Sequence, residues 1–238
     1  MTLLFRAAAA GVDSGDFAEV VAPSSIQAGD LLIAVVSVNN NIFETGTPDG
    51  WVALQAGIAG TSWGGLYMRR AEAGDGGRTF QFPSTATGGS AKEIISLAAY
   101  YSNAPGKYAA IDTSAIRLET TATATHAIPD LDAQVSGSIV VTGLAKKGST
   151  VQTITAPDGF TLRGNPALTG GTSNNGTAIA DTTVSTPGTV SGAWTVNVAN
   201  QAAVTFSVVV IEADAPTIPP LPKPVMRRWN GVEWTLIG

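Results

Sequence analysis

The chain has 238 residues and a mass of 24.2 kDa, long enough to bury a sizeable core within one domain. Its net charge of −5 argues against a nucleic-acid-binding surface, which would carry clustered basic side chains, and the absence of cysteine excludes a disulfide framework and thiolate chemistry. Charged residues make up only 13% of the chain, which suits subunits packed against neighbours, and no apolar run is long enough to predict membrane insertion.

Strand signals dominate the first half of the chain. Short β-branched or aromatic runs lie between Gly, Pro, Asp and Asn, and helical periodicity is almost absent. Strands are expected at 31–38, 51–54, 66–70, 79–82 and 94–101, with turns at Gly29-Asp30 and Pro48-Asp49-Gly50. The pattern predicts an all-β fold.

The same order of signals recurs in the second half. Strands are expected at 139–144, 160–162, 177–180, 193–196 and 204–211, and further strands in the connection 103–134. The matched landmarks, each about 110 residues apart, are Gly29 with Gly137, Pro48 with Pro157, Gly65 with Gly176, and Ser96 with Ser207. The chain therefore contains two pseudo-repeats, at about 26–103 and 135–213.

Two such repeats predict a particular architecture. A five-stranded sheet with one apolar face cannot bury that face alone, so two copies are expected to pack face to face. The prediction is an antiparallel, jelly-roll-like β-sandwich that occupies residues 1–213 as one domain. Two separate tandem sandwiches are the alternative.

The composition changes after Ala213, where residues 214–224 are rich in proline. Proline at this density excludes a helix or a central strand, and it favours a polyproline II linker of about 34 Å. The alternative is a tail that lies on its own domain.

Residues 225–238 predict a β-hairpin, because Asn230-Gly231 suits a two-residue type I′ turn. This turn would pair Trp229 with Val232, Arg228 with Glu233, and Arg227 with Trp234. Isolated hairpins are marginally stable, so this one is expected to anchor the chain on a partner protein. The candidate interaction residues are Arg227, Trp229, Val232, Trp234 and Leu236.

No motif for catalysis, metal binding or nucleotide binding is recognised in the sequence. The only histidine, His126, has no partner at a triad spacing and is expected to be a solvent-exposed strand residue. Asp49 and Asp158 lie in matched Pro-Asp-Gly turns and are interpreted as turn residues. The sequence thus indicates a protein that is not an enzyme and needs no cofactor.

A carbohydrate-binding module is an alternative function, because β-sandwiches often present aromatic platforms to sugars and this chain has several aromatic residues. Trp51 and its repeat counterpart Phe160 are expected to face the core. The glycan-binding candidates that remain are Trp63, Tyr100, Tyr101 and Tyr108.

Several segments together resemble minor tail proteins of tailed bacteriophages, especially those of actinobacterial hosts. They are 29–34 (GDLLIA), 48–51 (PDGW), 66–74 (LYMRRAEAG) and 97–101 (LAAYY), and 228–234 (RWNGVEW) resembles the tryptophan hairpin that ends many virion proteins. The resemblance implies a structural virion component of the tail tip or a fibre, assembled in the host cytoplasm with other virion proteins. A capsid decoration protein is the alternative. The resemblance to minor tail proteins also implies a homo-oligomer, since such fibre proteins are often trimeric. It further implies a host-surface glycan as a partner.

Overall fold

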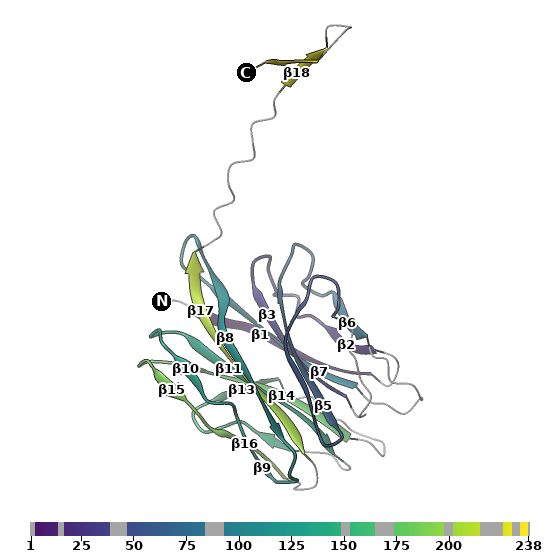
Figure 1. The fold of residues 1–238 in the computed structure, drawn as a ribbon, viewed down its shortest axis with the longest axis vertical. Coiled ribbons are helices and arrows are strands. Elements are labelled where there is room, and N and C mark those ends of the chain that lie inside the picture. Colours follow the sequence, from purple (N-terminus) through teal and green to yellow (C-terminus); the bar gives the residue numbers. More distant parts are fainter. Residues whose placement is uncertain are drawn as a thin grey trace.

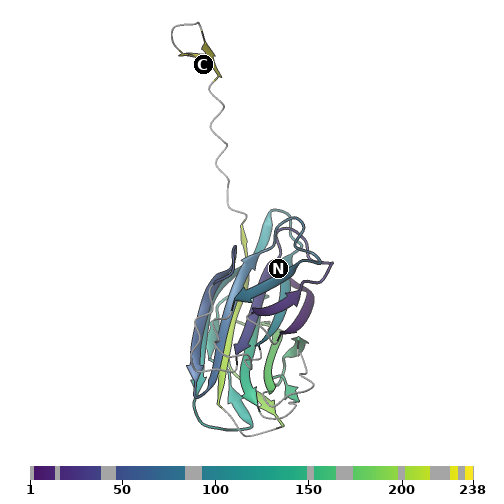
Figure 2. The same ribbon diagram turned by 90° about the vertical axis from the view of Figure 1, so that its right-hand side faces the viewer.

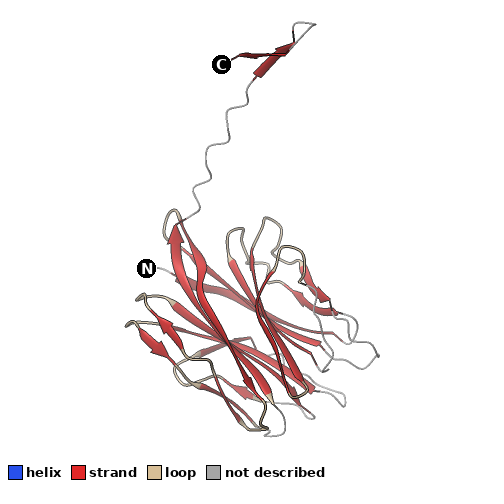
Figure 3. Cartoon of the chain, viewed as in Figure 1, coloured by secondary structure: helices blue, strands red, loops and turns tan. Residues whose placement is uncertain are grey.

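The computed structural model describes residues 3–13, 17–38, 47–83, 93–148, 153–164, 174–197, 202–214, 226–229 and 234–237. Within these ranges the chain forms strands and loops, with no helix (Figure 3). Two five-stranded antiparallel sheets pack face to face (Figure 1). The predicted all-β antiparallel sandwich is confirmed.

The two main sheets have the same strand order, and each is formed by one half of the chain. The first sheet consists, in spatial order, of β1 (Leu3–Asp13), β7 (Glu93–Ser102), β3 (Leu31–Val38), β5 (Ser62–Arg70) and β4 (Val52–Ala59). The second consists of β8 (Lys107–Glu119), β17 (Ala203–Asp214), β11 (Ile139–Gly148), β14 (Asn174–Thr183) and β13 (Thr161–Gly164). Strand by strand, the second list repeats the first.

The main hydrophobic core lies between the two sheets. The first sheet contributes side chains such as Ile33 and Val35, and the second contributes Val141, Phe206 and Val208. The two sheets come close together at glycines. A Cβ added to Gly143 on β11 would lie 2.4 Å from Cγ2 of Val35 on β3. Burying both inner faces is the main source of stability expected for such a sandwich.

Small sheets cover the outer faces of both main sheets, as the two views in Figures 1 and 2 show. On the first sheet, β2 (Phe17–Val21) pairs with β6 (Thr79–Pro83). On the second, the covering strands are β10 (Leu131–Ala133) with β15 (Gly188–Val190), and β12 (Ile154–Thr155) with β16 (Ala193–Val196) and β9 (Thr125–Ala127). The extra strands expected in 103–134 are confirmed as β8, β9 and β10. Because β3 is covered on both faces, all eight of its residues are buried.

Both sheets carry β-bulges at equivalent places. Arg6 interrupts the ladder between β1 and β7, and Asp112 interrupts the ladder between β8 and β17 at the matching position. Leu54 on β4 and Arg163 on β13 form the second matching pair. Two shared irregularities are stronger support for duplication than shared strand order, because a bulge adds one residue at one defined position.

The turns before matching strands are also repeated. Trp51 N–H donates to the Pro48 carbonyl at 3.0 Å, and Phe160 N–H donates to the Pro157 carbonyl at 3.0 Å. The central glycines of these turns, Gly50 and Gly159, have φ angles of 77° and 80°, a region that glycine adopts without steric cost. The turns predicted at the two Pro-Asp-Gly segments are confirmed.

One predicted landmark pairing is wrong by a single residue. Counted from the matched glycines Gly29 and Gly137, Val35 on β3 corresponds to Gly143 on β11. Ser96 lies opposite Val35 and Phe206 lies opposite Gly143, so Phe206, not Ser207, is the counterpart of Ser96. Successive strand residues face opposite ways, so this step moves a side chain from one face of the sheet to the other. The match of Gly65 with Gly176 also fails, because the counterpart of Gly65 in the ladder is Ala178.

Near the C-terminus, β18 (Met226–Trp229) pairs with β19 (Trp234–Ile237), so the predicted hairpin strands are present. Their register is not the predicted one. Trp229 pairs with Trp234 and Arg227 with Leu236, so the expected pairs of Trp229 with Val232, Arg228 with Glu233 and Arg227 with Trp234 are wrong. Residues 215–225 and 230–233, and with them most of the predicted linker and Val232, lie outside the described residues.

Candidate functional site

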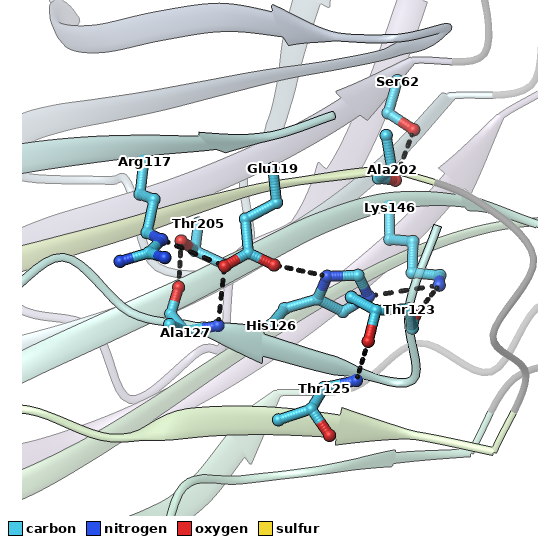
Figure 4. Close-up of polar contacts among 10 residues, drawn as sticks. All are labelled: Ser62, Arg117, Glu119, Thr123, Thr125, His126, Ala127, Lys146, Ala202 and Thr205. Carbon is cyan, nitrogen blue, oxygen red and sulfur yellow. Dashed lines mark hydrogen bonds and ion pairs between the residues drawn. The ribbon is translucent and has the colours of Figure 1, made fainter. Parts of the chain in front are cut away.

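A buried polar network joins β8 and β11 of the second sheet to β9 of the layer that covers it (Figure 4). His126 on β9 contacts Oε2 of Glu119 through Nδ1 at 3.1 Å and Nζ of Lys146 through Nε2 at 3.2 Å. The Lys146 ammonium also donates to the Thr123 carbonyl at 3.3 Å. His126 and Lys146 are both fully buried. The prediction of a solvent-exposed His126 is therefore wrong, because β9 lies over the outer face of the second sheet and directs this ring toward β11.

Several hydrogen bonds hold the Glu119 carboxylate in place at one end of the network. Glu119 stands at the end of β8, where its Oε1 accepts hydrogen bonds from the backbone N–H of Ala127 and from Nε of Arg117, each at 3.0 Å. The turn that follows brings the chain back along β9, so that Ala127 and His126 meet the same carboxylate (Figure 4). Three donors from two strands thus hold this carboxylate in one orientation.

The protonation states follow from burial. Burial lowers the pKa of Lys146 from 10.5 to about 8. Burial, together with the neighbouring Lys146 charge, lowers the pKa of His126 below 6.5. A neutral ring fits both contacts, since Nδ1–H can donate to Glu119 while Nε2 accepts from the Lys146 ammonium. The imidazole therefore connects a carboxylate to a buried ammonium group.

A second buried cluster links the two main sheets. The hydroxyl of Tyr100 on β7 donates to Oδ2 of Asp181 on β14 at 3.0 Å, and Nε of Arg163 donates to the same oxygen at 2.8 Å. Burial, with the adjacent Asp181 charge, raises the pKa of Tyr100 well above 10. The phenol therefore stays protonated and remains a hydrogen-bond donor across the core.

Two of the four glycan-binding candidates are in the core. Tyr100 is fully buried and Trp63 is 4% exposed, so neither ring offers a face to a sugar. Trp63 packs under the β2–β6 layer, which also covers Trp51. The expectation that Trp51 faces the core is confirmed, and its ring meets Phe82 edge-on with the centroids 4.9 Å apart. Its counterpart Phe160 is partly buried against the outer clusters of the second sheet.

The other two candidates, Tyr101 and Tyr108, line a common pocket of about 400 Å³. The guanidinium carbon of Arg6 lies 3.9 Å from the ring centroid of Tyr101, and that of Arg70 lies 4.4 Å from the centroid of Tyr108. The sequence patterns did not single out the two arginines, and they indicated Asp30, which pairs with Arg6, only as a turn residue. The only available signal was a charged residue within the apolar run of β1.

Four of the hairpin candidates lie on the two strands near the C-terminus. Arg227 and Trp229 lie on β18, and Trp234 and Leu236 lie on β19.

In the described part of the chain, no group of three or more His, Asp or Glu side chains is arranged to hold a metal ion. The described residues include no helix with the length and apolar character needed to cross a membrane. No family model, curated protein or solved structure matches the chain.

Proposed function

We propose that the chain is a non-enzymatic structural protein of a tailed-bacteriophage virion, a minor tail or fibre-associated component that assembles with other virion subunits. The observation that carries the proposal is the separate C-terminal hairpin. Among the described strands, β18 and β19 pair only with each other. A two-stranded hairpin buries too little apolar surface to be stable alone in water, so it is expected to dock on another protein.

The body of the protein supports the same role. The inner faces of the two main sheets are buried against each other and small sheets cover part of their outer faces, which gives a module with its own core without the hairpin. The segments that resemble minor tail proteins lie at fold-building positions, such as the Pro48-Asp49-Gly50 turn and the start of β3. The low fraction of charged residues suits packing against identical subunits, for which a trimer is the proposed state.

Deletion of residues 215–238 tests the anchoring role. The truncated protein is expected to keep the melting temperature of the full chain, because the sandwich core is untouched, but to be missing from purified particles. The readout is quantitative mass spectrometry of virions from the phage that encodes the chain. Incorporation of the truncated protein at the normal copy number would contradict the proposal.

A finer variant pair separates hairpin contacts from chain length. Trp229→Ala combined with Trp234→Ala should lower incorporation as the deletion does, whereas Thr235→Ser in the same hairpin should not. Immunogold labelling of the particles distinguishes the two virion positions. Label at the tail favours a minor tail protein, and label over the head favours the alternative of a capsid decoration protein.

A carbohydrate-binding module is a second candidate function. It is favoured by one observation, the meeting of Tyr101 and Tyr108 in one pocket.

A further inference from the structure

We infer that the pocket between Tyr101 and Tyr108 is a binding site for a neutral saccharide. The pocket lies where the first repeat passes into the second, between the end of β7 and the start of β8. Its volume of about 400 Å³ is within the range of small-ligand sites. The inference rests on the carbohydrate-binding candidate and not on the virion role, since it concerns the sandwich alone.

The β-bulge of β1 places the central polar group of the pocket. Arg6 is the bulged residue, and its Nε lies 2.6 Å from Oδ2 of Asp30. Asp30 also accepts a hydrogen bond from the backbone N–H of Gln27 at 2.9 Å, and its side chain is only 3% exposed. Bulges often redirect a side chain toward a functional site. Here the bulge places a guanidinium at the pocket, where the buried Asp30 carboxylate holds it in position.

Each of the two tyrosine rings packs against a guanidinium group. The Arg6 guanidinium covers one face of Tyr101, and Arg70 covers one face of Tyr108 while donating to the Gly29 carbonyl at 2.9 Å. Rings fixed in this way lose little entropy when a ligand packs against them. A tyrosine combines an apolar ring, which can pack on the C–H groups of a sugar, with a hydroxyl that can bond to the sugar's hydroxyl groups.

The charge balance of the pocket selects the ligand class. The charged groups in and beside the pocket are three cations and three carboxylates: Arg6, Arg70, Lys107, Asp30, Glu212 and Asp214. Lys107 pairs with Asp214 at 2.5 Å, and Ser102 donates to Glu212. No cation is left in excess to hold a phosphate or an acidic sugar. Fixed donors and acceptors that balance one another suit a neutral ligand with many hydroxyl groups.

The side chains that the first sheet contributes to the pocket are not repeated in the second sheet. By the ladder registers, the position of Arg6 is taken by Asp112 in the second repeat, and the position of Tyr101 is taken by Ile211. The second repeat therefore keeps the bulge but has neither the arginine nor the aromatic ring. A structural feature retained in both copies, with binding chemistry in one, indicates specialisation after duplication.

Saturation-transfer NMR with the full chain tests the inference. The probes are glucose, galactose, rhamnose and N-acetylglucosamine, with glucuronate and inorganic phosphate as charged comparators. At least one neutral sugar is expected to bind, and Tyr108→Ala should weaken its affinity about tenfold. Leu162→Ala, at an exposed apolar position on β13 that does not line the pocket, is the matched control and should leave the affinity unchanged.

The possible outcomes separate clearly. If Tyr108→Ala fails to fold, Asn103→Ala at the exposed rim replaces it and is expected to weaken binding in the same way. Binding of glucuronate or phosphate in preference to every neutral sugar would overturn the ligand class. Failure of all sugars to bind, or equal loss of binding in Leu162→Ala, would overturn the site. Because the assay uses purified protein, these outcomes say nothing against the particle-assembly role.

Discussion

His126 lies between a carboxylate and an ammonium group, and only its neutral form satisfies both. Protonation of Nε2 would remove the acceptor for Lys146 and place two positive charges 3.2 Å apart in a buried site. The charged groups around the ring are Glu119 and Lys146, with Arg117 on the far side of Glu119. The Glu119 contact favours the protonated ring, but burial and Lys146 outweigh it, so the pKa is lowered.

This lowered pKa predicts a loss of stability in mild acid. Because the unfolded histidine titrates near 6.5 and the folded one titrates lower, the unfolded state binds more protons between the two values. The free energy of unfolding should therefore be maximal with respect to this group above pH 6.5 and should fall as the pH drops toward the folded pKa. Urea unfolding of wild type and His126→Gln at pH 7.5, 6.5 and 5.5 measures the effect. Parallel pH profiles for the two proteins would show that His126 is not responsible.

At the scale of elements, glycines on the inner faces allow the two main sheets to pack closely together. Gly143 on β11 faces Val35 on β3, and both strands are central in their sheets. Gly64 on β5 makes a similar approach, since a Cβ there would lie 2.7 Å from the Cβ of Ala145. Core interiors are packed too tightly to absorb an extra methyl group without movement. These glycines thus set the spacing of the sandwich.

Gly143→Ala is expected to lower the free energy of unfolding by about 1–3 kcal/mol through overpacking. Val35→Ala should also destabilise, by leaving a cavity. The double variant should cost less than the two single changes added together, because the new methyl group occupies the space that the valine leaves. Chemical denaturation measures all three variants, and Gly188→Ala, with open space at its Cβ, is the control expected to be near neutral. Strict additivity would rule out the direct contact.

At the scale of the whole molecule, the core between the two main sheets is shared by both halves of the chain. Each main sheet supplies one wall of the shared core, and the Tyr100 to Asp181 hydrogen bond crosses it. The hydrogen bond from Ser62 to the Ala202 carbonyl at 2.9 Å also joins the two halves of the chain. The repeats are therefore expected to fold and unfold together.

Differential scanning calorimetry checks this expectation on the full chain. The sandwich should melt in one transition, with a calorimetric enthalpy equal to the van't Hoff enthalpy. Gly143→Ala should shift that whole transition to lower temperature without splitting it. Two resolved transitions would mean that the repeats are independently stable.

Local signals explain why much of the fold was predictable from sequence. The Pro-Asp-Gly turns and the buried run of β3 depend on nearby residues, so the strands and the sandwich could be inferred. The register could not, since one residue decides which face a side chain occupies, as the Ser96 and Ser207 pairing shows. The pairing predicted for the hairpin near the C-terminus was wrong for the same reason, because its observed register differs from that of a two-residue turn.

The candidate sites were less predictable, because they depend on layers that meet only in three dimensions. His126 is buried by the covering strands, and its partners Glu119 and Lys146 lie 7 and 20 residues away in sequence. Tyr100 and Tyr101 are adjacent in sequence, yet one enters the core and the other lines a pocket, as strand alternation requires. Their different surroundings follow from which side of β7 each one occupies.

The place of β17 in the second sheet has a mechanical consequence. This strand ends at Asp214, where the sandwich leads into the C-terminal segment, and it is hydrogen-bonded to β11 on one edge and β8 on the other. Tension applied along the strand from its C-terminal end would load both ladders in shear, so that many hydrogen bonds resist at once. An edge strand pulled outward would instead open one bond at a time. The chain therefore leaves the sandwich from a strand suited to carrying load.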